Sequence, residues 1–194
     1  MKKLTLQDIR SLFEYQRERE EFRREVIDVT RKRRVHLGEL VSLVFENRDT
    51  VRFQVQEMMR TERMTDEAAI QEELDVFNPL IPDQGELSAT MFIEIADPQR
   101  VEEELNRLVG IEDSVYLQIG DEYTEKGRAE PGRTTQEKVS AVQYVKFRLT
   151  PEEMKSFSQG DKDIYFLIDH PNYQARAKLA PETRRALDED LLAA

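Results

Sequence analysis

Hydrophobic positions along this chain follow a helical period up to about residue 82, and a mixture of helical and alternating patterns after it. Between Leu6 and Val29 the apolar residues recur every three or four positions. This spacing predicts a helix over residues 5–34 with a break near Tyr15. Residues 40–45 form a short apolar run, which predicts a strand.

Two further helices are predicted in the same part of the chain. Residues 50–63 carry Val and Met at helical spacing, so this helix has one apolar face. In the next helix Thr65 is the predicted N-cap, and Asn78-Pro79 is the predicted end because proline cannot continue a helix. Residues 78–83 contain two prolines and predict a stiff loop.

Strands alternate with short helices from Leu87 onward. A helix that starts at Asp97-Pro98 should end at Gly110, and Thr150-Pro151 starts another with threonine as cap and proline in the first turn. A last helix opens at Pro181. The strands are predicted over residues 89–95, 115–119, 139–149 and 164–168, and residues 120–138 predict a long hairpin excursion or mobile loop.

These elements predict the α+β class, with N-terminal helices packed on an antiparallel sheet. A chain of 194 residues can form one hydrophobic core, so we expect a single domain over residues 1–194. It would comprise a mainly helical part, 1–82, and an α+β part, 83–194. The β-α-β-β-α-β order after residue 88 is that of a ferredoxin-like fold, although the same four strands also suit another antiparallel sheet.

Composition removes several functional classes from consideration. The formal net charge of −11 disfavours binding to nucleic acid or to an anionic membrane surface. The absence of cysteine excludes disulfides, a thiolate nucleophile and cysteine-ligated iron–sulfur clusters. With no apolar run long enough for a signal or spanning segment, we expect a cytoplasmic protein, and we predict no cofactor.

Polar side chains on the helix predicted over residues 50–63 form the candidate binding site. Arg52, Gln56 and Arg60 are four residues apart and share one helical face, and Asn47 and Arg48 precede them. Guanidinium groups present a planar set of donors that suits carboxylates and phosphates, so this stripe predicts binding of a small anion. Alternatively, the same arginines form ion pairs with acidic residues of the third helix.

Two residues are candidates for proton transfer if the protein is an enzyme. Glu57 lies beside the arginine stripe, and His170 ends a predicted strand, where imidazole can act as an acid or a base. His170 equally suits a polar turn before a proline. No residue is assigned a catalytic role, and no metal site is predicted, because the chain has two histidines and no Glu-x-x-His motif.

Several segments together resemble one bacterial family, DUF3501, across nearly the whole chain. They are Phe45-Glu46-Asn47-Arg48, Gln54-Val55-Gln56-Glu57-Met58, Asn78-Pro79-Leu80-Ile81-Pro82, Glu86-Leu87-Ser88-Ala89-Thr90 and Ile168-Asp169-His170-Pro171. The family name carries no activity, cofactor or catalytic residue. The resemblance implies an accessory role in redox or peroxide defence, because similar proteins are encoded near rubrerythrin-like and iron–sulfur proteins.

Our leading hypothesis is therefore a cytoplasmic accessory or binding protein whose functional face comprises residues 47–63 and 78–83. Its partner would be a redox protein or a small anion. The alternative is an enzyme acting on a small anionic substrate through a pocket of arginine, glutamine and glutamate side chains. Neither hypothesis specifies an oligomeric state.

Overall fold

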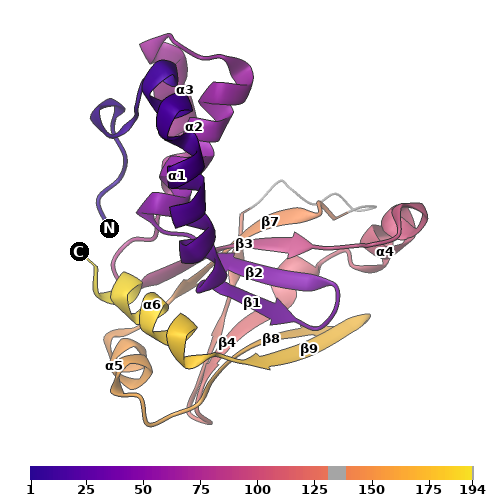
Figure 1. Cartoon of the computed structure of the whole chain (residues 1–194). Coiled ribbons are helices and arrows are strands. Elements are labelled where there is room, and N and C mark those ends of the chain that lie inside the picture. The colour runs from indigo at the N-terminus through magenta and orange to yellow at the C-terminus, as the bar shows by residue number, and fades with distance from the viewer. Residues whose placement is uncertain (131–138, 194) are drawn as a thin grey trace.

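A computed structural model describes residues 1–130 and 139–193 of the protein. Two antiparallel sheets form the body of the molecule, and a group of three helices extends from one side of it (Figure 1). The predicted α+β class is confirmed. Within the described ranges, no helix is long and apolar enough to cross a membrane.

The N-terminal helices are α1 (Leu12–Arg31), α2 (Arg48–Glu62) and α3 (Glu67–Phe77), after a 3₁₀ turn at Leu6–Asp8. The break predicted near Tyr15 lies instead just before Ser11, which caps α1 in a capping box with Glu14. Tyr15 is fully buried within the helix. Asp66, rather than Thr65, caps α3 by accepting the backbone N–H of Ala69 at 3.1 Å.

The larger sheet has the strand order β1-β2-β3-β7-β6. Its strands are β1 (Arg34–Leu37), β2 (Val41–Phe45), β3 (Glu86–Ile93), β7 (Val142–Arg148) and β6 (Arg128–Ala129). The sequence predicts a helix through residue 34 and no strand over Arg34–Leu37, so β1 is a correction to that prediction. Gly38 turns the chain from β1 to β2 with a φ of 72°, and an added Cβ would lie 2.4 Å from the Tyr173 hydroxyl oxygen.

The second sheet has the order β5-β4-β8-β9. Its strands are β5 (Tyr123–Lys126), β4 (Val115–Ile119), β8 (Ile164–His170) and β9 (Tyr173–Lys178). The ferredoxin-like arrangement is therefore wrong, because it needs the four predicted strands in one sheet. Instead β3 pairs antiparallel with β7, and β4 pairs antiparallel with β8 in the other sheet. Alternating apolar residues specify which face of a strand is buried, but not which strand lies beside it.

Part of the predicted excursion over residues 120–138 is strand. Strand β5 forms a hairpin with β4, and β6 adds to the edge of the larger sheet. Residues 131–138 of the predicted excursion lie outside the described residues.

The main core lies between the two sheets. Phe45 from one sheet and Phe166 from the other have ring centroids 4.8 Å apart, and Phe147 lies 5.3 Å from Phe166. The helices α4 (Val101–Arg107), α5 (Pro151–Gln159) and α6 (Pro181–Leu192) border this core, to which Leu105, Phe157 and Leu187 contribute buried side chains. Aromatic and aliphatic burial of this kind provides most of the driving force for folding.

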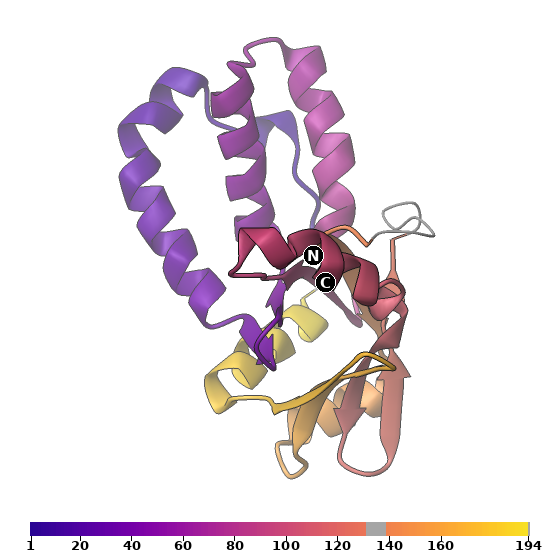
Figure 2. The same cartoon turned by 90° about the vertical axis from the view of Figure 1, so that its right-hand side faces the viewer.

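The face of the larger sheet that is turned away from the smaller sheet carries the helical group (Figures 1 and 2). A second apolar cluster, formed by buried residues of α2 and α3 such as Val55 and Leu74, packs against Tyr144 of β7. The strand register places Arg34, Val44, Thr90 and Tyr144 in one row across four strands. These side chains therefore point to the same outer face, where the candidate site lies.

Candidate functional site

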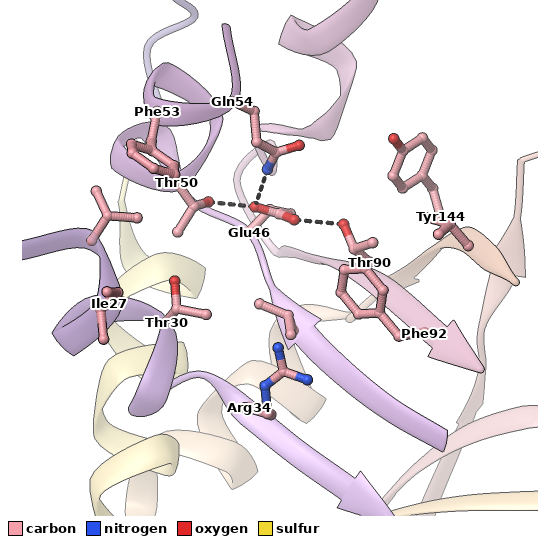
Figure 3. A pocket seen from close by; sticks show the side chains of 13 residues that line it. Ile27, Thr30, Arg34, Glu46, Thr50, Phe53, Gln54, Thr90, Phe92 and Tyr144 are labelled. Carbon is pink, nitrogen blue, oxygen red and sulfur yellow. Dashed lines mark hydrogen bonds between the residues drawn. The ribbon is translucent and has the colours of Figure 1, made fainter. Parts of the chain in front are cut away.

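A cavity of about 570 Å³ lies between the outer face of the larger sheet and helices α1 and α2 (Figure 3). We call it the Glu46 cavity. Its lining comes from four strands or strand ends and two helices: Val26, Ile27, Thr30, Arg34, Val44, Glu46, Thr50, Phe53, Gln54, Thr90, Phe92, Val142 and Tyr144. A volume of this size is typical of sites for small organic molecules.

Glu46 occupies the junction between β2 and α2. Its backbone N–H donates to the Ser88 carbonyl oxygen at 2.8 Å, which holds the strand end against β3. Asn47 then caps α2, because its side-chain oxygen accepts the backbone N–H groups of Asp49 and Thr50, each at 3.0 Å. Thr50 and Gln54 follow Glu46 at intervals of four residues, so the helix brings both to the same side as Glu46.

Three donors hold the Glu46 carboxyl group in this position. The Thr50 hydroxyl and the Gln54 amide, at 2.9 Å, both donate to Oε2, and the Thr90 hydroxyl donates to Oε1 at 2.5 Å. Figure 3 shows all three contacts converging on Glu46 from α2 and β3. Only 4% of Glu46 is exposed. The side chain is thus a buried acid with three side-chain donors from α2 and β3.

Burial raises the pKa of Glu46 above the usual value for glutamate, because a carboxylate loses solvation there. The hydrogen bonds from Thr50, Thr90 and Gln54 and the nearby Arg33 guanidinium oppose that change. An acid with a raised pKa in an apolar cavity is a characteristic feature of binding and catalytic sites. Such a group can accept a hydrogen bond, compensate a ligand cation or exchange a proton.

The rest of the cavity wall is mainly apolar. Phe53 from α2 and Phe92 from β3 present aromatic rings, and aliphatic side chains of α1 and the sheet complete the surface. Arg34 lies over the Phe92 ring, with 5.6 Å from the guanidinium carbon to the ring centroid. The same guanidinium donates to Ser42 Oγ at 2.8 Å and to Glu94 Oε1 at 2.9 Å, so its charge is already paired.

The arginines of the predicted stripe make ion pairs within the protein. Arg48 pairs with Asp8 at 2.5 Å, and Arg52 pairs with Asp49 at 3.3 Å. The first ion pair joins α2 to the N-terminal 3₁₀ turn. The second lies within the first turns of α2 and stabilises them. The carboxylates therefore come from the N-terminal segment and from α2 itself, not from the third helix.

Gln56 and Asn47, the amides of the predicted site, both satisfy backbone groups. Gln56 is 1% exposed; its side-chain oxygen accepts the Arg10 N–H at 2.7 Å, and its nitrogen donates to the Arg10 carbonyl oxygen at 3.2 Å. It thereby fixes the extended segment before α1, as Asn47 fixes the start of α2. Neither residue lines the Glu46 cavity.

Glu57 and Arg60 belong to a polar cluster between α1 and α2. The Glu57 carboxylate accepts from Arg19 Nε at 2.8 Å, from the Tyr15 hydroxyl at 2.7 Å and from Arg60 Nη2 at 3.2 Å. The Arg19 hydrogen bonds in particular lower the pKa of Glu57 to about 2. Glu57 is therefore a carboxylate at neutral pH, and this charged form suits ion pairing with Arg19 and Arg60.

His170 lies at the end of β8 in the smaller sheet and is 6% exposed. Its Nδ1 accepts the Asn172 N–H at 3.2 Å, so Nε2 carries the proton and donates to the Val109 carbonyl oxygen at 3.0 Å. His170 thus holds the β8–β9 turn against the end of α4. The structure does not bring it together with the arginine stripe or with Glu57.

The seven predicted site residues consequently do not surround one cavity, and a ligand-binding or catalytic role for them stays a prediction. The residues that do converge, Glu46, Thr90 and Arg34, were not selected from the sequence. The spacing of Glu46, Thr50 and Gln54 was a usable signal, because a residue just before a helix and those four and eight positions later share a side. No local signal connects them to Thr90 or Arg34. Within residues 1–130 and 139–193 there is no group of three or more His, Asp or Glu that could hold a metal ion.

Comparison with known proteins identifies relatives without a known activity. The family model described as "Protein of unknown function (DUF3501)" matches residues 3–191. The chain is also similar to a protein from Burkholderia pseudomallei K96243, described as a novel protein of unknown function in its crystal structure at 1.90 Å resolution. The two share 34% identity with a TM-score of 0.92, over 98% of this chain and 100% of the other. Among curated proteins no sequence matches this chain.

Proposed function

Given that the chain belongs to the DUF3501 family of proteins of unknown function, we propose that it binds a small organic molecule in the Glu46 cavity. The proposal refines the expected binding role and moves it from the arginine stripe to the outer face of the larger sheet. Its ligand would lie between α1, α2 and the row of side chains from Arg34 to Tyr144.

The observation that carries the proposal is the buried carboxyl group of Glu46 on the cavity wall. A buried acid loses several kcal/mol of solvation, and an apolar residue at such a position commonly gives equal or greater stability. Here three donors from two elements, α2 and β3, are arranged around the group. An arrangement that stabilises an acid beside an open apolar cavity is expected where the acid contacts a ligand.

The alternative hypothesis, an enzyme that acts on a small anionic substrate, has less support than the binding role. Arg34 is the arginine that lines the cavity, and Glu94 already pairs with it. The arginines of α2 pair with Asp8, Asp49 and Glu57. An anion would have to displace a carboxylate at each of these positions. An accessory role beside a redox protein stays a prediction that rests on the family resemblance.

A ligand screen on the intact protein tests the proposal. A fragment library with neutral, cationic and anionic members would be screened by ligand-observed NMR, and hits would be measured by calorimetry. Ile27→Trp should abolish binding, because Ile27 is half-exposed and a larger ring there fills the cavity mouth. Val76→Trp is the matched control, since Val76 is exposed on α3 and lies outside the cavity.

Hits that lose affinity in the Ile27→Trp variant and keep it in the Val76→Trp variant would support the cavity as the binding site. A library without hits, or hits that bind both variants equally, would overturn the proposal.

A further inference from the structure

We propose that the ligand of the Glu46 cavity is an organic cation, namely a primary amine on a compact apolar body, with its ammonium group against Glu46. This inference rests on the proposed binding function and assigns its ligand class. It follows from the unused hydrogen-bonding capacity, the charge pairing and the apolar walls of the cavity.

The side chains of Thr50, Gln54 and Thr90 all act as hydrogen-bond donors to the Glu46 carboxyl group. The Thr50 and Thr90 hydroxyls both donate to Glu46 oxygens, and the Thr50 hydroxyl also lies 3.1 Å from the Asn47 carbonyl oxygen and accepts the Asn47 N–H at 3.0 Å. Gln54 uses an N–H for the same contact, and Figure 3 shows its amide oxygen directed away from Glu46. What remains for a ligand are acceptors, because the Thr90 hydroxyl oxygen and the Gln54 amide oxygen can still accept hydrogen bonds. A group with several donors and no acceptor, such as an ammonium, matches this surface.

Charge pairing leads to the same ligand class. The Arg33 guanidinium binds both carboxylate oxygens of Asp190, with 3.0 Å for the Nη2–Oδ1 contact. Arg34 pairs with Glu94. Within the described part of the chain no salt bridge to Glu46 is present, and the nearby Arg33 is already bound to Asp190, so the carboxylate form of Glu46 lacks an ion-pair partner. A cationic ligand would supply the missing charge and favour the ionised form.

The apolar walls of the Glu46 cavity indicate the character of the part of the ligand that carries the ammonium group. Phe53 and Phe92 provide aromatic surface, and Val26, Val44 and Val142 provide aliphatic surface. Thr30 of α1 lines the side opposite the sheet, and Figure 3 shows it in the space between α1 and Glu46. An aryl or branched alkyl group of about ten heavy atoms would bury most of its area in a cavity of this volume. Neutral and anionic molecules of the same shape would leave the Glu46 carboxylate uncompensated.

Three probes that differ in one functional group separate this inference from the proposed function. They are 2-phenylethylamine, 2-phenylethanol and 3-phenylpropionate, measured by calorimetry at pH 7.5 with the intact protein. The amine should bind at least about tenfold more tightly than the alcohol, since its ammonium group makes an ion-paired, charge-assisted hydrogen bond with Glu46 and the alcohol does not. The propionate should bind most weakly, because its carboxylate would face Glu46.

Two variants locate the ammonium group. Glu46→Gln keeps the size of the side chain and removes its charge, so the affinity for the amine should fall at least about tenfold while the affinity for the alcohol changes less than about threefold. Gln54→Leu, a change at a partly exposed position, should lower the affinity for the amine by about threefold. Gln71→Leu, on the exposed side of α3, is its matched control and should have no effect.

An alcohol or propionate that binds as tightly as the amine would overturn the ligand class and leave the proposed function in place. An affinity for the amine that is unchanged in both Glu46→Gln and Gln54→Leu would also overturn it. Failure of all three probes and of the fragment library would overturn the inference together with the proposed function.

Discussion

Glu57→Gln tests whether Glu57, on the polar face of α2, stabilises the fold or transfers a proton. The Glu57 carboxylate contacts Arg19 and Tyr15 on α1 and Arg60 on α2, with distances of 2.7 to 3.2 Å for its closest contact to each. Glutamine has the same shape but no charge, and its amide nitrogen would face donors. The change should therefore weaken the contact between the two helices.

The pKa of Glu57 sets the size of the effect. Its hydrogen bonds to Arg19 are the main cause of the decrease in pKa from 4.5 to about 2. At about 1.4 kcal/mol for each pKa unit, a difference of about 2.5 units corresponds to at most about 3.5 kcal/mol. The side chain is 23% exposed, so solvent screening reduces the expected loss of unfolding free energy to about 1–2 kcal/mol at pH 7.

The pH dependence has a definite sign. Because folding lowers the pKa of Glu57, its contribution to stability is present in full above about pH 4.5 and is lost as the pH falls toward 2. Urea denaturation of wild type and Glu57→Gln at pH 7, 5, 4 and 3 measures the unfolding free energy of each. The difference between the two proteins should decrease as the pH falls. Glu20→Gln is the control, because Glu20 also pairs with Arg19, at 3.2 Å, but its side chain is 75% exposed.

Glu20→Gln should change the unfolding free energy by less than about 0.5 kcal/mol. A Glu57→Gln loss no larger than this control, or a difference from wild type that stays constant between pH 7 and pH 3, would refute the structural role. Such a result would return Glu57 to the proton-transfer role expected from the sequence.

Three other substitutions test the buried polar residues Glu46, Asp190 and His170 by urea denaturation. Burial raises the pKa of Glu46, so the contribution of Glu46 to the unfolding free energy falls as the pH rises above 4.5. Glu46→Gln should therefore become more stable relative to wild type between pH 4 and pH 8. A difference in unfolding free energy that stays constant over this range would contradict the prediction. Asp190→Asn leaves the Arg33 charge unpaired in the core and should cost about 3–5 kcal/mol, whereas a loss below about 1 kcal/mol would show that the pair is not buried in solution. His170→Ala removes two hydrogen bonds and should cost about 1–3 kcal/mol without affecting ligand binding in the Glu46 cavity; loss of binding would contradict its structural role.

Elements with strong local signals were predicted well from the sequence. Thr150 caps α5 in a capping box with Glu153, and Gly160 ends the helix in the left-handed conformation, as predicted. The last helix opens at Pro181, also as predicted. These signals act through hydrogen bonds and dihedral angles within about four residues, so they do not depend on the rest of the fold.

Strands with mixed polarity were harder to recognise. Strand β9 alternates half-buried and exposed residues and contains Gln174, Arg176 and Lys178, so its apolar positions, Ala175 and Ala177, give a weak pattern. Its place in the sheet comes from pairing with β8 along the whole strand. Backbone hydrogen bonds to a neighbour stabilise such a strand even where its side chains bury little area.

Local sequence therefore determined the α+β class, most helices and the caps that start and end them, because each depends on interactions between residues close in the chain. Tertiary structure alone decided the pairing of β3 with β7 and of β4 with β8, since alternation does not identify a partner. The Glu46 cavity depends on the order of β1, β2, β3 and β7 in the larger sheet. Glu46 and Thr90 are 44 residues apart in the chain, and their contact exists only because β2 and β3 are neighbours in register.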